Sequence, residues 1–133
     1  MTSKVIYTGS LRTEAMHLKS GSTIITDAPI DNHGKGEAFS PTDTVATALA
    51  SCMLTVMGIK AKDLQLNLKG TSAEVTKTMA ANPRRISRVE ITITFPEAYS
   101  GKSQKILEHT ARTCPVLESL HPEMEKVIHF KYL

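Results

Sequence analysis

The stretch SPTDTVATALASCMLTVMGIKAK, residues 40–62, decides the fold, because it predicts one long helix that is apolar on almost every side. Ser40 is a good N-cap, Pro41 suits the first helical position, where its missing N–H costs nothing, and Asp43 stands where a capping box places its acid. The apolar residues are Val45, Ala46, Ala48, Leu49, Cys52, Met53, Val56, Met57 and Ile59. They leave no wide polar face, so we expect a buried central helix, covered either by a sheet and a second helix or in part by a second chain.

The segments around this helix predict an α+β fold in one domain, residues 1–133. Three short strands precede it as an antiparallel meander, and a long exposed connection rich in Asp, Asn, Gly and Pro, residues 27–41, leads into it. Alternating apolar residues, a turn at Asn82-Pro83 and two helical patterns follow. The predicted order is βββ-α-ββ-α-α-β, with antiparallel strands in the sheet. The expected strands are residues 4–8, 12–19, 22–26, 64–68, 89–95 and 127–132. Besides the long helix, the expected helices are residues 103–114 and a short one that begins at residue 115.

Composition excludes several classes of protein. Of 133 residues, 41% are hydrophobic and 22% charged, and no unbroken apolar run approaches the ~18 residues of a bilayer span, so we expect no membrane association. The net charge of +3 is scattered and only 5% of residues are aromatic, which argues against nucleic-acid binding. The N-terminus, MTSKVIYTGS, has no apolar run typical of a secretory signal, which predicts a cytoplasmic protein with reduced thiols.

The two cysteines, Cys52 and Cys114, are the candidate reactive groups. Neither lies in a CxxC motif, and the histidines show no metal-ligand spacing, so we expect no metal and no cofactor. A cysteine on a buried helix is most often a small apolar side chain, and the alternative is a nucleophile. Cys114 precedes Pro115 at the expected start of a short helix, where free N–H groups favour a thiolate. It is either a resolving partner for Cys52 or an unrelated buried residue.

A reactive thiol also needs a nearby cation, since the free thiol has a pKa of ~8.5. Arg12 on an N-terminal strand is the candidate for that charge, the alternative being a solvated strand residue. Asp43 stands nine residues before Cys52, which places it on the opposite side of the helix and about 13 Å away along the axis. Asp43 therefore serves the helix start, or else orients an arginine in a site shared between two subunits.

Two segments carry a resemblance to a known family. The chain resembles the OsmC/Ohr family of osmotically inducible and organic hydroperoxide resistance proteins, and in particular its OsmC-like branch, in GKGEAFSPTDTVATALASCMLTVMGIKA, residues 34–61, and ARTCPVLESLHPE, residues 111–123. The resemblance implies an intertwined homodimer with long central helices and thiol-dependent reduction of hydroperoxides. It implies Cys52 as the peroxidatic cysteine, Cys114 as the resolving one, and Arg12 as the arginine that lowers the pKa of the first. Family peroxidases hold this arginine with a glutamate near the helix start, where this chain has Asp43, with Glu37 in the preceding loop as a substitute.

These observations lead to a functional hypothesis with two rivals. We expect a cytoplasmic, peroxiredoxin-like thiol peroxidase that acts in oxidative stress defence on organic, and also inorganic, hydroperoxides. An external thiol reductant, such as a lipoyl dithiol, would recycle it. The first rival is a non-catalytic protein that binds a small apolar ligand, and the second is a thiol redox sensor.

Overall fold

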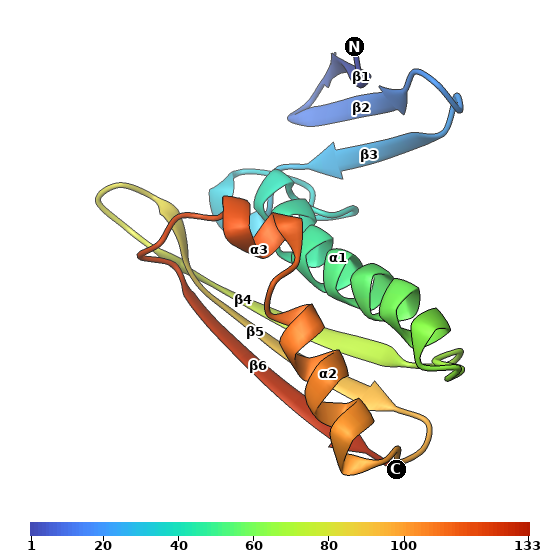
Figure 1. The fold of residues 1–133 in the computed structure, drawn as a ribbon. Coiled ribbons are helices and arrows are strands. Elements are labelled where there is room, and N and C mark those ends of the chain that lie inside the picture. The colour runs from blue at the N-terminus through green and yellow to red at the C-terminus, as the bar shows by residue number, and fades with distance from the viewer. The chain divides into compact units, whose positions relative to one another are not determined.

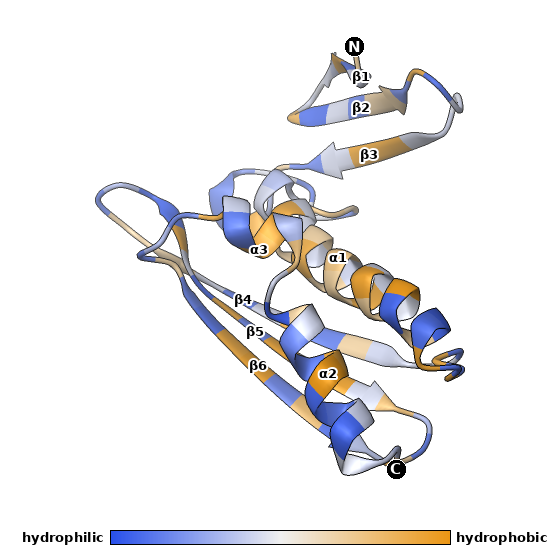
Figure 2. Cartoon of the chain, viewed as in Figure 1, coloured by the Kyte–Doolittle hydropathy of each residue, from blue (hydrophilic) through white to orange (hydrophobic).

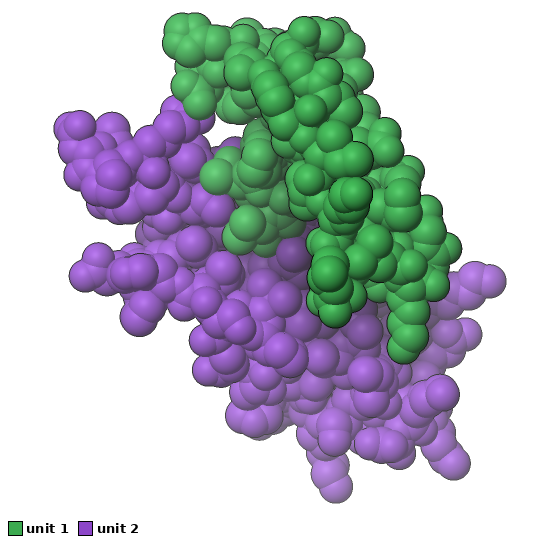
Figure 3. Space-filling model, turned by 90° about the horizontal axis from the view of Figure 1, so that it is seen from above, with its two compact units in different colours: residues 1–45 green, residues 46–133 purple.

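The computed structural model describes all 133 residues of the chain, and Figure 1 shows their elements. It contains two compact units, residues 1–45 and 46–133, which are coloured separately in Figure 3 and are described here one at a time. The long helix begins in the first unit and continues in the second. The expected order βββ-α-ββ-α-α-β is confirmed, with one added short 3-10 helix, and the expectation of a single domain stays a prediction.

The first unit is built on an antiparallel meander, as the sequence predicts. Its strands are β1 (Ser3–Gly9), β2 (Arg12–His17) and β3 (Thr23–Asp27), and η1 (Ile30–Asn32) follows in the connection to the long helix. The register of β2 with β3 pairs Arg12 with Asp27 at one end of the ladder. Directly opposite residues of two antiparallel strands project on the same side of the sheet, so this register brings the two side chains together.

The long helix α1 (Pro41–Asp63) begins where the capping signals predict and ends one residue beyond the expected boundary. The backbone N–H of Asp43 donates to Ser40 Oγ at 3.1 Å, and the N–H of Ser40 donates to Asp43 Oδ2 at 2.9 Å. This reciprocal pair is a capping box with Asp in place of the usual Glu. Asp43 therefore stabilises the start of the helix.

Burial of α1 is one-sided within the single chain. Its buried residues are Ala46, Leu49, Ala50, Met53, Met57 and Ala61, whereas Val45 and Ile59 are exposed. By length and composition α1 could cross a membrane, although no unbroken run in the sequence predicts a span. The core helix of a globular protein meets the same criteria, and the buried face of α1 packs in the apolar core of this one.

The second unit contains a three-stranded sheet of β4 (Ser72–Ala80), β5 (Arg85–Phe95) and β6 (Glu125–Tyr132), in the order β4-β5-β6. Strands β4 and β5 are antiparallel, but β5 and β6 are parallel, so the expectation of antiparallel strands throughout is wrong for this pair. The reason lies in the connection from β5 to β6. It contains α2 (Gly101–Ala111) and α3 (Pro115–Ser119) and is long enough for a parallel crossover, which needs a dozen residues or more.

The expected strand at 64–68 is also wrong. These residues follow the end of α1, where Leu66 N–H donates to Ala61 O at 2.9 Å and Gln65 has a positive φ of 57°. Leu64, Leu66 and Leu68 are half-buried against the core, so their alternation reflects packing of an irregular segment. The strand that pairs with β5 is β4, whose half-buried positions include alanine and lysine and therefore give a weaker apolar pattern.

The core of the second unit lies between the helices and one face of this sheet (Figure 1). Leu49, Met53 and Met57 of α1 belong to the same apolar cluster as Ile91, Ile93 and Phe95 of β5 and Leu107 of α2, and all seven are fully buried. Figure 2 shows apolar residues along much of α1 and a mixture of polar and apolar residues on α2. The buried face of α1 is thus the central layer on which the second unit is assembled.

The capping box yields a stability prediction. We expect Ser40→Ala to lower the free energy of unfolding by about 1 kcal/mol, because it removes the hydroxyl that accepts the Asp43 N–H. Ser51→Ala is the matched control, since Ser51 is an exposed residue of the same helix and alanine favours helices. Urea denaturation of both variants tests this, and equal stabilities would contradict it.

Candidate functional site

The most strongly paired charge in the first unit is the Arg12 guanidinium. Arg12 Nε donates to Asp27 Oδ1 at 2.6 Å and Arg12 Nη2 donates to Asp27 Oδ2 at 2.8 Å, which makes a two-point pair. The Asp27 side chain is 1% exposed, whereas that of Arg12 is 29% exposed. This pairing, followed by the opposing charge of Asp27, raises the pKa of Arg12, and the same hydrogen bond with Arg12 holds the pKa of Asp27 below its usual value. Both groups are therefore charged at neutral pH.

Glu37 is a second and weaker partner of Arg12. Arg12 Nη2 lies 3.4 Å from Glu37 Oε2, and the Glu37 side chain is 66% exposed. The backbone N–H of Glu37 also donates to Asp27 Oδ2 at 3.2 Å, so the loop before α1 contributes to the Asp27 site through its main chain.

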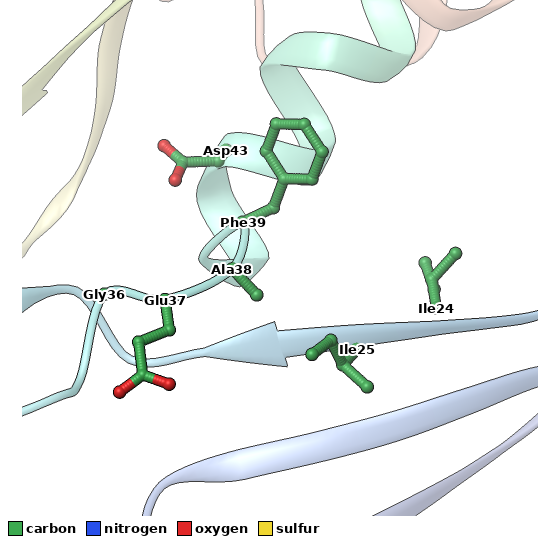
Figure 4. A pocket seen from close by; sticks show the side chains of 7 residues that line it. All are labelled: Ile24, Ile25, Gly36, Glu37, Ala38, Phe39 and Asp43. Carbon is green, nitrogen blue, oxygen red and sulfur yellow. The ribbon is translucent and has the colours of Figure 1, made fainter.

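A pocket of about 660 Å³ lies in the same unit, beside this loop (Figure 4). Figure 4 shows Ile24 and Ile25 on β3, and Phe39 with Asp43 at the start of α1. The pocket is lined by Ile24, Ile25, Gly36, Glu37, Ala38, Phe39 and Asp43. Its wall is thus largely apolar, with two acidic groups.

The sequence patterns point to Arg12, Glu37 and Asp43 but not to Asp27. The ion pairs of Arg12 are with Asp27 and Glu37, while Asp43 belongs to the capping box of α1. A signal for Asp27 was present in the sequence, because strands paired across the Ser20-Gly21 turn place Arg12 opposite Asp27. Finding it required the register of the hairpin in addition to the residue types.

The structure brings the two cysteines of the second unit together. Cys52 is half-buried on α1, and Cys114 is buried as the N-cap of α3, where its Sγ accepts a hydrogen bond from the N–H of Leu117 at 3.4 Å. Cys52 packs against the apolar cluster that contains Cys114, and it lies near enough to raise the pKa of the Cys114 thiol. Neither cysteine is in a disulfide, and no group of three or more His, Cys, Asp or Glu side chains is arranged to hold a metal ion.

The N–H groups at the start of α3 act on Cys114 in the expected direction, but they do not decide its pKa. Burial raises the pKa of the Cys114 thiol, Cys52 raises it further, and the N–H groups of Leu117 and Val116 offset only part of this change. Burial prevails because a buried thiolate loses its hydration. Cys114 is therefore a protonated and shielded thiol at neutral pH.

This difference between the thiols predicts the order of alkylation. We expect iodoacetamide at neutral pH to modify Cys52 and to leave Cys114 unmodified in the folded protein, because Cys114 is fully buried and its pKa is raised. In denaturant both should react. Peptide mass mapping after timed quenching measures this, and modification of Cys114 first in the folded state would contradict it.

Comparisons with known proteins agree with this architecture. The family model for OsmC-like proteins matches residues 34–127. A crystal structure from Psychrobacter arcticus 273-4, provisionally described as an osmotic stress induced and detoxification response protein, is 59% identical to the chain, with a TM-score of 0.95. That match covers 98% of this chain and 95% of the other. No protein of curated function matches the chain.

More distant structures share the fold. An organic hydroperoxide resistance protein OsmC from Legionella pneumophila is 13% identical, with a TM-score of 0.77 over 98% of this chain and 97% of the other. An organic hydroperoxide resistance protein from Elizabethkingia anophelis is also 13% identical, with a TM-score of 0.77 over 100% of this chain and 97% of the other. The family model and the relative from Psychrobacter, together with this shared fold, establish that the chain belongs to the OsmC-like family.

Proposed function

We propose that this protein is a thiol-dependent hydroperoxide reductase in which Cys52 is the peroxidatic cysteine and Cys114 the resolving cysteine. The observation that carries the proposal is the proximity of the two thiols in the core of the second unit, one half-buried and one fully buried. The family membership supports the same reaction class, since two structural relatives are named as organic hydroperoxide resistance proteins. If the two cysteines served only to fill the core, nothing would require them to lie close together at the start of α3.

The first step is an attack by the Cys52 thiolate on the distal oxygen of a hydroperoxide. The S–O bond forms as the O–O bond breaks, and the departing alkoxide takes a proton to leave as an alcohol. Cys52 is oxidised to a sulfenic acid and the hydroperoxide is reduced. Cys52 fits this role better than Cys114, because it is the thiol that retains exposure.

The second step is condensation of the two sulfurs. The Cys114 thiol attacks the Cys52 sulfenic acid, a disulfide forms, and the sulfenic oxygen leaves as water. The N–H of Leu117 already donates to Cys114 Sγ and supports negative charge that develops there. An external dithiol, of which a lipoyl group is one example, then reduces the disulfide by exchange and is itself oxidised to a disulfide.

Arg12 supplies positive charge in this proposal. A guanidinium stabilises both the thiolate that attacks and the alkoxide that leaves, and its charge persists at every relevant pH. The assignment of Arg12 to Cys52 comes from the family resemblance. Of the two acids expected near this arginine, Glu37 makes a weak ion pair with Arg12, and Asp43 caps the start of α1.

The active form in this proposal is a cytoplasmic homodimer. Support comes from large apolar side chains that the single chain leaves exposed, since exposed apolar surface often marks a protein–protein interface. In the first unit and on α1 they include Val5, Ile6, Tyr7, Leu11, Ile24, Ile25, Phe39, Val45 and Ile59. A second copy with the same surface would cover such residues in a two-fold interface.

The peroxidase proposal predicts distinct outcomes for the two cysteine variants. With cumene hydroperoxide and a dithiol reductant, Cys52→Ser should lose consumption entirely, whereas Cys114→Ser assayed without any reductant should consume about one equivalent per chain and stop at the sulfenic acid. Stopped-flow assays of hydroperoxide loss and trapping of the sulfenic acid with dimedone measure this. Full turnover by Cys52→Ser would contradict the proposal.

The role of Arg12 predicts a shift in the reactivity of Cys52. In a Cys114→Ser background, Arg12→Ala should slow the alkylation of Cys52 by iodoacetamide at pH 7 by about tenfold, because the thiolate loses a stabilising positive charge. The rate of alkylation, followed by mass spectrometry, measures this. An unchanged rate would remove Arg12 from the mechanism.

A further inference from the structure

A second cavity lies wholly within the second unit, bordered by the last turn of α1 and by one side of α2. Both helices lie on the same face of the sheet of β4, β5 and β6 (Figure 1). The volume of the cavity is about 490 Å³, which is ample for a small organic molecule. Its lining contains three basic side chains and no acidic one: Lys60, Lys105, Ile106, His109, Thr110 and Thr113.

Packing of the two helices brings these basic groups to one place. Lys105 and His109 are four residues apart and are therefore neighbours on one side of α2. Lys60 borders the same cavity from α1, and the buried faces of both helices belong to one apolar cluster. Like charges at this spacing repel each other, so an anion in the cavity would relieve a repulsion that the fold maintains.

The basic groups keep donors that the chain does not use. Lys60 Nζ lies 3.8 Å from Asp63 Oδ2, a long contact to a side chain that is 72% exposed. Lys105 and His109 make no ion pair or hydrogen bond through their side chains. Glu108 of α2 accepts a hydrogen bond from a tyrosine hydroxyl of β6 at 3.0 Å, so this acid is engaged on the side of the sheet. The cavity therefore offers several donors to a negatively charged ligand.

The two threonines in the lining supply acceptors. Thr110 Oγ1 donates to Ile106 O at 2.8 Å, and Thr113 Oγ1 donates to Thr110 O at 3.1 Å. Because both hydroxyl protons are used within the chain, the hydroxyl oxygens remain as acceptors for a ligand. A molecule that satisfies the whole lining carries an anionic group together with hydroxyl groups.

We propose that this cavity binds a small phosphate monoester that also carries hydroxyl groups, such as a phosphorylated polyol. A phosphate monoester has nearly two negative charges at neutral pH and three strong acceptor oxygens, which suit two ammonium groups and an imidazole donor. A carboxylate has one charge and two oxygens in one plane, so it satisfies fewer of these donors. The site is separate from the thiols and does not depend on the peroxidase function proposed above.

The test is a titration of the isotope-labelled, full-length protein with glycerophosphate at constant ionic strength, followed by NMR. We expect saturable shifts of the amide signals of residues 105–113 and of the turn that contains Lys60. Succinate, a dicarboxylate of similar size, should bind at least about tenfold more weakly, because each of its carboxylates matches fewer donors. Inorganic phosphate should also bind more weakly than glycerophosphate, since it has no polyol hydroxyls for the threonine oxygens.

Substitutions of single lysines test the lining directly. Lys60→Gln and Lys105→Gln should each weaken glycerophosphate binding by about tenfold, because each removes a charged hydrogen-bond donor. Lys62→Gln is the matched control, since Lys62 is exposed on α1 and lies about 200° around the helix axis from Lys60. It should leave the affinity unchanged. Thermal melts without ligand show that each variant is folded.

Three results would overturn the proposal. The first is the absence of saturable shifts at the cavity. The second is an equal loss of affinity in Lys62→Gln, which would indicate attraction to the basic surface as a whole. The third is succinate or inorganic phosphate binding as tightly as glycerophosphate, which would remove the selection for a hydroxylated phosphate ester.

Discussion

The packing of the buried face of α1 against β5 and α2 is the constraint on which the chemistry of the second unit depends. Fully buried residues from these three elements form one cluster, and Cys114 belongs to it. The cluster fixes the start of α3 beside the middle of α1, which is where Cys52 lies. Close packing of this kind allows little rearrangement, so the proximity of the two thiols is a property of the folded core.

The same packing divides the roles of the two thiols. Burial raises the pKa of Cys114 and keeps its thiol protonated, whereas Cys52 remains half-buried on the outer side of the cluster. In the proposed reaction, a hydroperoxide would therefore meet Cys52 first. Cys114 would react only after the sulfenic acid has formed on Cys52.

Three acids of the first unit, Asp27, Glu37 and Asp43, make three different kinds of contact. Asp27 is buried and holds the guanidinium at two points, Glu37 is exposed and makes one long contact, and Asp43 closes the first turn of α1. The pair in this unit is thus an arginine held at two points by a buried carboxylate.

The sequence predicted those elements whose formation depends on residues close together in the chain. The capping box at Ser40 and Asp43, the apolar run that follows it, and the turns of the N-terminal meander all act within a few residues, and the corresponding elements are present. The predictions were wrong where the structure depends on pairing between distant segments. The parallel direction of β5 and β6 depends on the crossover between them, and the position of β4 depends on its pairing with β5 more than on its own apolar pattern. Asp27 was missed because its role follows from the strand register, and the pKa of Cys114 was misjudged because the degree of burial is a tertiary property.

The central claim is that one equivalent of hydroperoxide oxidises Cys52 and Cys114 of the same chain to a disulfide. The most direct measurement is the intact mass of the reduced protein after one equivalent of cumene hydroperoxide, followed by peptide mapping without reduction. The account predicts a loss of two hydrogens per chain and a peptide pair joined through Cys52 and Cys114. A chain that keeps both thiols free, or that gains oxygen at methionine while Cys52 stays reduced, would contradict it.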